Sequence, residues 1–159
     1  MDMLLAIEPL EILTPRILVC DDNDTGRALM KRMLRARGYL VEEASEGRSA
    51  IAAIERSPPD LLLLDLRLPD IDGSEVLRQL RCDHDVKALP IIMVSAEHDG
   101  EIVAGCLALG ASDYITKPIH AGILCARVAT HLDLHFSHAC PPAAVTRPRP
   151  RLVSVRHRN

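Results

Sequence analysis

From residue 16 to about residue 136, the sequence alternates short apolar runs with longer stretches in which apolar and polar residues mix. The apolar runs fall at 17–20, 39–43, 61–64 and 91–94, with a short fifth run near Tyr114 and Ile115. The run 61–64 is four leucines, and a strand that is apolar on both faces is typical of a parallel sheet covered by helices on both sides. The alternation therefore predicts five βα units.

Each stretch between these runs carries an apolar face at the 3.6-residue spacing of an α-helix, and we expect its other faces to be polar. The five faces comprise Leu29, Met30, Met33 and Leu34; Ala50, Ile51 and Ile54; Val76, Leu77 and Leu80; Ile102, Val103, Cys106 and Leu107; and Leu124, Val128 and Leu132. Glycines and prolines separate these predicted helices from the predicted strands. The predicted fold class is α/β, a (βα)5 doubly wound sheet of five parallel strands.

The pattern divides the 159 residues into an N-terminal extension at 1–15, one folded domain at 16–136 and a tail at 137–159. The tail interleaves prolines with arginines and has no apolar period, so it is predicted to be disordered. An apolar content of 48% with 26% charged residues is typical of soluble globular proteins. Because aromatic residues make up only 2% of the chain, the interior is expected to be aliphatic.

The net charge of −3 conceals an acidic body and a basic tail. All 22 acidic residues lie at or before Asp133, and five arginines follow without any acid. An acidic body argues against nucleic-acid binding through backbone phosphates, so only the tail could bind nucleic acid, and weakly. A solvated tail without a specific partner is the alternative.

The expected location is the cytoplasm, with no membrane contact. The five cysteines form no CxxC pair, which indicates reduced thiols. Residues 1–15 lack a basic leader, and their apolar run is broken by Glu8 and Pro9, so it is too short to span a bilayer.

Polar residues interrupt the pattern where the predicted strands end: Asp21 and Asp22 after the first, Asp65 after the third, Ser95 after the fourth and Lys117 after the fifth. The carboxyl ends of parallel strands meet at one edge, where open α/β sheets bind ligands. Three crowded carboxylates repel each other unless a cation lies among them, and Mg²⁺ prefers such oxygen ligands. Lys117 and the Ser95 hydroxyl would then bind phosphoryl oxygens.

Four motifs at these strand ends resemble one family, the CheY-like response-regulator receiver domains of two-component signal transduction. They are ILVCDDN at 17–23, DLRLPDIDG at 65–73, VSA at 94–96 and GASDYITKP at 110–118. The resemblance covers residues 16 to about 134, and four motifs in order are far more specific than any one alone. It implies the flavodoxin-like strand order 2-1-3-4-5.

The resemblance also implies a role for each site residue. Asp65 would be the phosphoacceptor, and Asp22 and Asp65 would bind Mg²⁺ directly with the Arg67 carbonyl, while Asp21 acts partly through water. Ser95, the Ala96 amide and Lys117 would bind the phosphoryl group, Tyr114 would turn inward as Ser95 moves, and the bond to Pro118 would be cis. A histidine kinase or histidine phosphotransfer protein would be the donor. A protein partner or a second copy would read the surface of the fourth helix, fifth strand and fifth helix.

Such a domain is a signalling switch that catalyses only its own phosphorylation and dephosphorylation. One alternative is a Mg²⁺-dependent aspartyl-phosphate phosphatase resembling the haloacid-dehalogenase-like hydrolases, but their second Asp, two positions after the nucleophile, is Arg67 here. The other is a scaffold that takes no phosphate, and the intact Asp65, Ser95 and Lys117 count against it.

Other polar residues are given structural roles. Asp24 is assigned to capping the first helix or to supporting the site, and Asp70 and Asp72 to shaping the turn before Gly73. His131, His135 and His138 share a helical face and could bind a metal, although complementing the helix dipole is the favoured role. His98 lies near the mouth of the site, without an expected catalytic role.

Overall fold

The computed structural model describes residues 14–139 as five strands alternating with five helices. Most of the predicted extension and tail therefore lies outside the described residues. The elements are β1 (Arg16–Cys20), α1 (Asp24–Arg35), β2 (Leu40–Ala44), α2 (Gly47–Arg56), β3 (Leu61–Leu64), α3 (Gly73–Asp83), β4 (Ile91–Ser95), α4 (Gly100–Ala108), β5 (Asp113–Thr116) and α5 (Ala121–Ala139).

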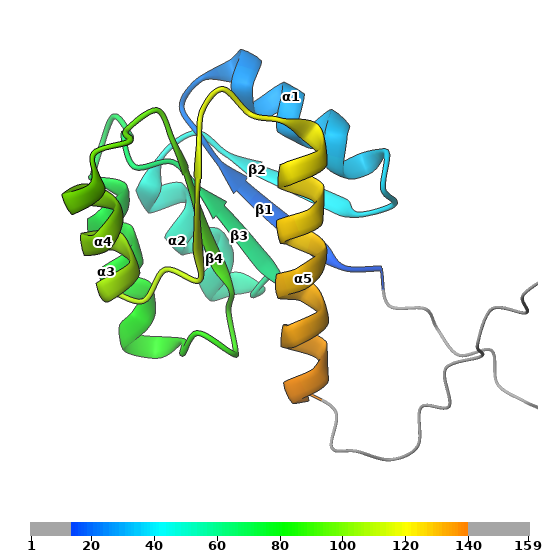
Figure 1. The fold of residues 1–159 in the computed structure, drawn as a ribbon. Coiled ribbons are helices and arrows are strands. Elements are labelled where there is room, and N and C mark those ends of the chain that lie inside the picture. The colour runs from blue at the N-terminus through cyan, green and yellow to red at the C-terminus, as the bar shows by residue number, and fades with distance from the viewer. Residues whose placement is uncertain (1–13, 140–159) are drawn as a thin grey trace, which may run out of the picture.

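The five strands form one parallel sheet in the order β2-β1-β3-β4-β5, which confirms the predicted fold class and strand order. Helices α1 and α5 cover one face, and α2, α3 and α4 cover the other (Figure 1). No helix in the described part of the chain is both long and apolar enough to cross a bilayer.

The leucine run of β3 explains why both faces of the central strands are apolar. Leu62 and Leu64 pack into the cluster beneath α2, α3 and α4, whereas Leu61 and Leu63 pack beneath α1 and α5. All four side chains are buried, and each such burial contributes roughly 1.5–3 kcal/mol. The strand is therefore held from both sides, and Asp65 follows it directly.

Short polar side chains fix where the helices begin, although not always those predicted. Asn23, not Asp24, caps α1 by accepting a hydrogen bond of 2.8 Å from the Gly26 amide. The capping role assigned to Asp24 is therefore wrong, because this residue already lies in the first helical turn. There its carboxylate pairs with Arg27, whose guanidinium also donates to the Asp21 carbonyl at 2.7 Å.

The two aspartates before Gly73 act on different helices. Asp72 caps α3 through the Ser74 amide, as its place in the turn suggested. Asp70 instead accepts hydrogen bonds of 2.8 Å from the Gly47 and Arg48 amides, at the start of α2. It thereby supplies the side-chain cap that Glu46, at the N-cap position, does not provide.

Helix α4 departs from the expectation that each helix has polar outer faces. Only Cys106 in it is buried, and Glu101 is its single charged residue. Leu107 is 46% exposed and Leu109, just after the helix, is 41% exposed. Helix α4 therefore leaves apolar surface uncovered within the described residues.

The contact of Gly73 with the backbone around Asp65 generates a stability prediction. A Cβ at Gly73 would lie 2.1 Å from the Asp65 carbonyl oxygen and 2.8 Å from the Leu66 Cα, neither of which can move freely. We expect Gly73→Ala to lower the free energy of unfolding by about 1–3 kcal/mol, measured by urea denaturation.

Gly105→Ala is the matched control, because a Cβ there meets no atom within 4 Å. This change in a helix interior should raise stability by roughly 0.5–1 kcal/mol. Equal stability of the two variants would contradict the tight packing at Gly73.

Candidate functional site

The structure brings the side chains from the strand ends to one edge of the sheet. Backbone hydrogen bonds align the strand ends: the Asp21 amide donates to Ala44, the Asp65 amide to Cys20, and the Lys117 amide to Ser95. Carboxylate oxygens of Asp21, Asp22 and Asp65 lie within 4.8 Å of one another. The parallel sheet therefore forms the predicted acidic cluster.

Lys117 bridges two carboxylates of this cluster. Its Nζ lies 2.8 Å from Asp21 Oδ2 and 2.8 Å from Asp65 Oδ2. The peptide bond between Lys117 and Pro118 is cis. The ammonium thus joins the end of β5 to the ends of β1 and β3, across 96 and 52 residues of sequence.

Burial dominates the electrostatics of this site, since Asp21 is fully buried and Asp65 is only 6% exposed. Burial raises the pKa of Asp65 above its ordinary value, although hydrogen bonds from Lys117 and the Arg67 amide act in the opposite direction. Burial also lowers the pKa of Lys117, but its bonds to Asp21 and Asp65 outweigh this, so the net shift is upward. Lys117 therefore stays charged, whereas the ionisation of Asp65 is opposed by its burial.

The residues present fit a small divalent cation. Three carboxylates lie close together and a single ammonium pairs with two of them, which leaves negative charge uncompensated. Mg²⁺ takes such hard oxygen ligands while keeping some of its waters. Asp22 is exposed, so water can reach that side of the cluster. Among the described residues, this is the one group of three or more side chains that could hold a metal ion.

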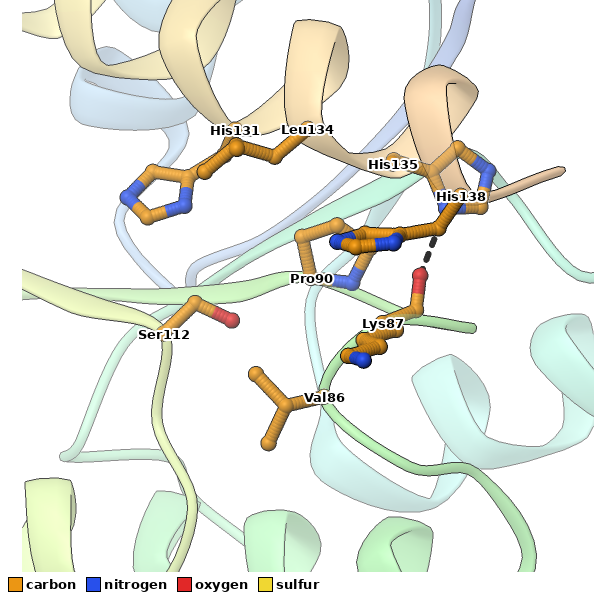
Figure 2. A pocket seen from close by; sticks show the side chains of 8 residues that line it. All are labelled: Val86, Lys87, Pro90, Ser112, His131, Leu134, His135 and His138. Atoms are coloured by element: carbon orange, nitrogen blue, oxygen red, sulfur yellow. Dashed lines mark hydrogen bonds between the residues drawn. The ribbon is translucent and has the colours of Figure 1, made fainter. Parts of the chain in front are cut away.

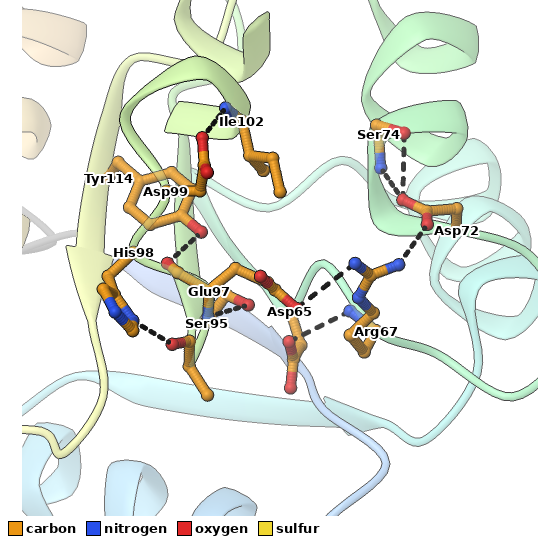
Figure 3. Close-up of polar contacts among 11 residues, drawn as sticks. Asp65, Arg67, Asp72, Ser74, Ser95, Glu97, His98, Asp99, Ile102 and Tyr114 are labelled. Atoms are coloured by element: carbon orange, nitrogen blue, oxygen red, sulfur yellow. Dashed lines mark hydrogen bonds and ion pairs between the residues drawn. The ribbon is translucent and has the colours of Figure 1, made fainter. Parts of the chain in front are cut away.

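A second network connects Ser95 with Tyr114 through one loop residue. Ser95 is 1% exposed, and its Oγ accepts a hydrogen bond of 3.3 Å from the Glu97 amide. The Tyr114 hydroxyl donates to the Glu97 carbonyl at 2.7 Å, so the phenol lies against the loop between β4 and α4 (Figure 3). Ala96, between Ser95 and Glu97, is exposed at the mouth of the site.

Arg67 lies beside Asp65 but turns its charge away from the acidic cluster. Its amide donates to Asp65 Oδ1 at 3.1 Å, while its guanidinium pairs with Asp72 at 3.4 Å and Glu97 at 3.2 Å (Figure 3). The side chain is 63% exposed. A phosphatase would need a general acid/base at this position, and a solvent-facing guanidinium cannot fill that role.

The sequence analysis missed two residues that support the site. Glu97 contacts Ser95, Tyr114 and Arg67, and Arg27 holds the Asp21 carbonyl. Glu97 could have been found, because it follows Ser95 by two residues in a loop at the same sheet edge. Arg27 had no comparable signal, since arginines on a helix surface are common.

The histidines do not assemble a metal site in the described residues. His131 Nε2 lies 3.1 Å from Asp113, and His135 uses one ring nitrogen for the Lys87 carbonyl and the other for Asp60. Both histidines line a pocket of about 170 Å³ together with Val86 and Ser112 (Figure 2). Because Ser112 directly precedes β5, this pocket lies at the edge where the strands begin, opposite to Asp65. Within residues 14–139, the hydrogen-bond contact recorded for His98 is with the Ala96 carbonyl, at 3.3 Å.

Comparisons with known proteins agree with this geometry. The model of the response regulator receiver domain family matches residues 17–129. Response regulator PleD of Caulobacter vibrioides is 38% identical over 117 residues, which cover 73% of this chain and 26% of PleD. Regulatory protein VanRc of Enterococcus gallinarum is 40% identical over 121 residues, covering 76% of this chain and 51% of VanRc.

A solved structure shows the same fold. The CheY-like response regulator receiver domain protein of Methanospirillum hungatei JF-1 superimposes with a TM-score of 0.74 at 30% identity, covering 79% of this chain and 98% of that one. The chain thus spans about a quarter to a half of the curated relatives but nearly all of an isolated receiver domain. The family match over residues 17–129, together with the fold, shows that this chain belongs to the response regulator receiver domains of two-component signalling.

Proposed function

We propose that this chain accepts a phosphoryl group onto Asp65 from the phosphohistidine of a histidine kinase or histidine phosphotransfer protein. The observation that carries the proposal is the position of Lys117 Nζ, 2.8 Å from both Asp65 and Asp21. An ammonium between two buried carboxylates is suited to hold a phosphoryl oxygen once one of those carboxylates is modified.

In the transfer, an Asp65 carboxylate oxygen attacks phosphorus, a P–O bond forms, and the P–N bond of the phosphohistidine breaks. The imidazole leaves with the electron pair of that bond and takes up a proton. Bound Mg²⁺ would neutralise charge on the phosphoryl oxygens, and Asp21, Asp22, Asp65 and the Arg67 carbonyl would hold it. Lys117 pairs with one phosphoryl oxygen, while the Ser95 hydroxyl and the Ala96 amide bind others.

The network through Glu97 supports a switch at the α4-β5-α5 surface. A phosphoryl oxygen at Asp65 would compete with the Glu97 amide for the Ser95 hydroxyl, and the Glu97 carbonyl already accepts from Tyr114 on β5. A local charge event is thus transmitted to the loop that begins α4 and to an edge strand. A downstream protein or a second copy of the chain would read the change.

This switch is a better fit than either alternative. A phosphatase lacks its general acid/base, because Arg67 turns toward Asp72 and Glu97. A scaffold without phosphate chemistry would have no use for an Asp65 whose burial raises its pKa and that lies beside two further carboxylates. The only catalysis proposed is therefore phosphorylation and dephosphorylation of Asp65 itself.

Phosphorylation is the direct test. With Mg²⁺ and a small acyl phosphate, we expect the intact mass to rise by one phosphoryl group, and Asp65→Asn to prevent this gain. Asp24→Asn is the matched control, because Asp24 is exposed and outside the carboxylate cluster. A stoichiometric gain in the Asp65→Asn protein would assign the phosphoacceptor elsewhere.

Stability should depend on pH through the same carboxyl group. Since the folded-state pKa of Asp65 is raised, its contribution to stability is full below its unfolded value, near 3.8, and is lost as the pH rises through the folded value. In EDTA at neutral pH, we therefore expect Asp65→Asn to melt a few degrees above the parent, with the difference vanishing as the pH falls toward 3.8.

Calorimetry with and without Mg²⁺ checks this expectation. Added Mg²⁺ should raise the melting temperature of the parent more than that of Asp65→Asn, because only the parent keeps all three carboxylates. Glu55→Gln, at an exposed position on α2, should change neither dependence. A parent more stable than Asp65→Asn in EDTA at neutral pH would contradict the raised pKa.

Tyr114→Phe tests the connection to the α4-β5-α5 surface. This change removes the hydroxyl that donates to the Glu97 carbonyl, a hydrogen bond of the kind worth ~1 kcal/mol, so the switching equilibrium should shift roughly fivefold. Amide NMR with a beryllofluoride phosphoryl analogue should then show smaller shifts over residues 100–128, with phosphorylation of Asp65 unchanged. Tyr39→Phe, at the start of the β2 edge, is the control and should behave as the parent.

A further inference from the structure

Helix α4 and helix α3 flank a groove of about 540 Å³ that the proposed phosphoryl chemistry does not use. Its lining is mainly apolar: Leu66, Ile102, Gly105, Cys106, Ala108 and Leu109. Arg67, Asp72 and Ser74 form its polar end, at the carboxyl edge of the sheet. A helix that is apolar nearly all round is normally buried, so the open side of α4 requires a cover.

Residues 1–13 of the same chain have the composition of such a cover. Nine of these thirteen residues are apolar, including the continuous run 3–7, and none is basic. Such a run would itself be a liability if left in water. One chain thus carries both an apolar groove and an apolar segment.

The connection allows the two to meet. The described chain begins at Thr14, just before β1. Helix α4 runs back from the end of β4 toward the start of β5, so it ends at the edge where the strands begin (Figure 1). The groove reaches this edge at Ala108 and Leu109. β1 lies two strands from β4, or roughly 10 Å, and the helix layer adds about as much again. Measured from Thr14, the chain to Ile7 spans up to about 23 Å when extended and the chain to Met3 up to about 36 Å, so residues 3–7 can reach the groove.

The charged residues near the groove indicate the orientation in which the N-terminal segment would bind. A segment running from Thr14 through the groove would bring its N-terminal end to the polar end, where the Arg67 side chain is largely exposed. Asp2 precedes the apolar run and would meet this guanidinium. The Arg67 side chain is 63% exposed and its guanidinium has five N–H donors, so it can accept a further acidic partner besides Asp72 and Glu97.

We propose that residues 3–7 of the chain bind in cis in the groove between α3 and α4, with Asp2 next to Arg67. This surface is distinct from α4-β5-α5, because it lies on the α3 side of α4. When bound in the groove, the segment would contact Arg67, which itself pairs with Glu97. The segment would then lie beside the loop that Tyr114 and Ser95 contact. The segment is therefore positioned to influence how readily that loop rearranges.

Hydrogen exchange of the full-length chain tests the proposal, with two variants and a control. Leu5→Asp/Ile7→Asp alters the segment alone. Gly105→Glu places a charged side chain in the groove, at a position with no atom within 4 Å of an added Cβ. Gly100→Glu is the control, because Gly100 is equally open and on the same helix but does not line the groove.

In the parent we expect amides of residues 3–7 to exchange about tenfold or more slowly than in an unstructured peptide. Gly105→Glu should abolish this protection, Gly100→Glu should keep it, and Leu5→Asp/Ile7→Asp should accelerate exchange in α4. Unprotected residues 3–7 in the parent, or equal protection in the two glycine variants, would overturn the proposal. Protection that rises with protein concentration would also overturn it, by assigning the groove to the segment of a second copy.

Discussion

The arrangement of the whole site depends on one ammonium held between two buried carboxylates. Asp21 and Asp65 end neighbouring strands, and their charges would repel at this distance in a poorly solvated environment. Lys117, which follows the edge strand β5, compensates part of that repulsion by pairing with both carboxylates. The ends of β1, β3 and β5 are therefore coupled by charge as well as by backbone hydrogen bonds, and a change in the charge of Asp65 alters all three.

Glu97 extends this coupling beyond the carboxylates. It offers its amide to Ser95, its carbonyl to Tyr114 and its side chain to Arg67. These three partners come from β4, β5 and the loop after β3. A movement of any of them would therefore alter a contact of Glu97. A single loop residue with three kinds of contact is a compact means of joining an electrostatic event to a change in packing.

Much of the fold and of the candidate site could be predicted from the sequence, because both follow from the spacing of apolar residues and from the polar residues at the strand ends. The apolar runs placed all five strands within about one residue, and the polar residues that follow them named the side chains that now lie at one sheet edge. The helix starts were harder: Asn23 and Asp24 are both good caps, and only the backbone conformation selects Asn23. The contact of Asp70 with α2 spans more than twenty residues, and no local pattern indicates it.

The composition of α4 has a consequence for the dynamics of the fold. Gly105, in the helix interior, lowers the intrinsic stability of the helix by roughly 0.5–1 kcal/mol relative to alanine. Of its nine residues only Cys106 is buried, and Ile102 packs partly buried against the same core. Such a helix forms a weak cooperative unit, with an opening free energy well below that of the central strands. The α4 segment is thus the part of this sheet-centred molecule that thermal fluctuations can detach and reseat while the carboxylate cluster stays assembled.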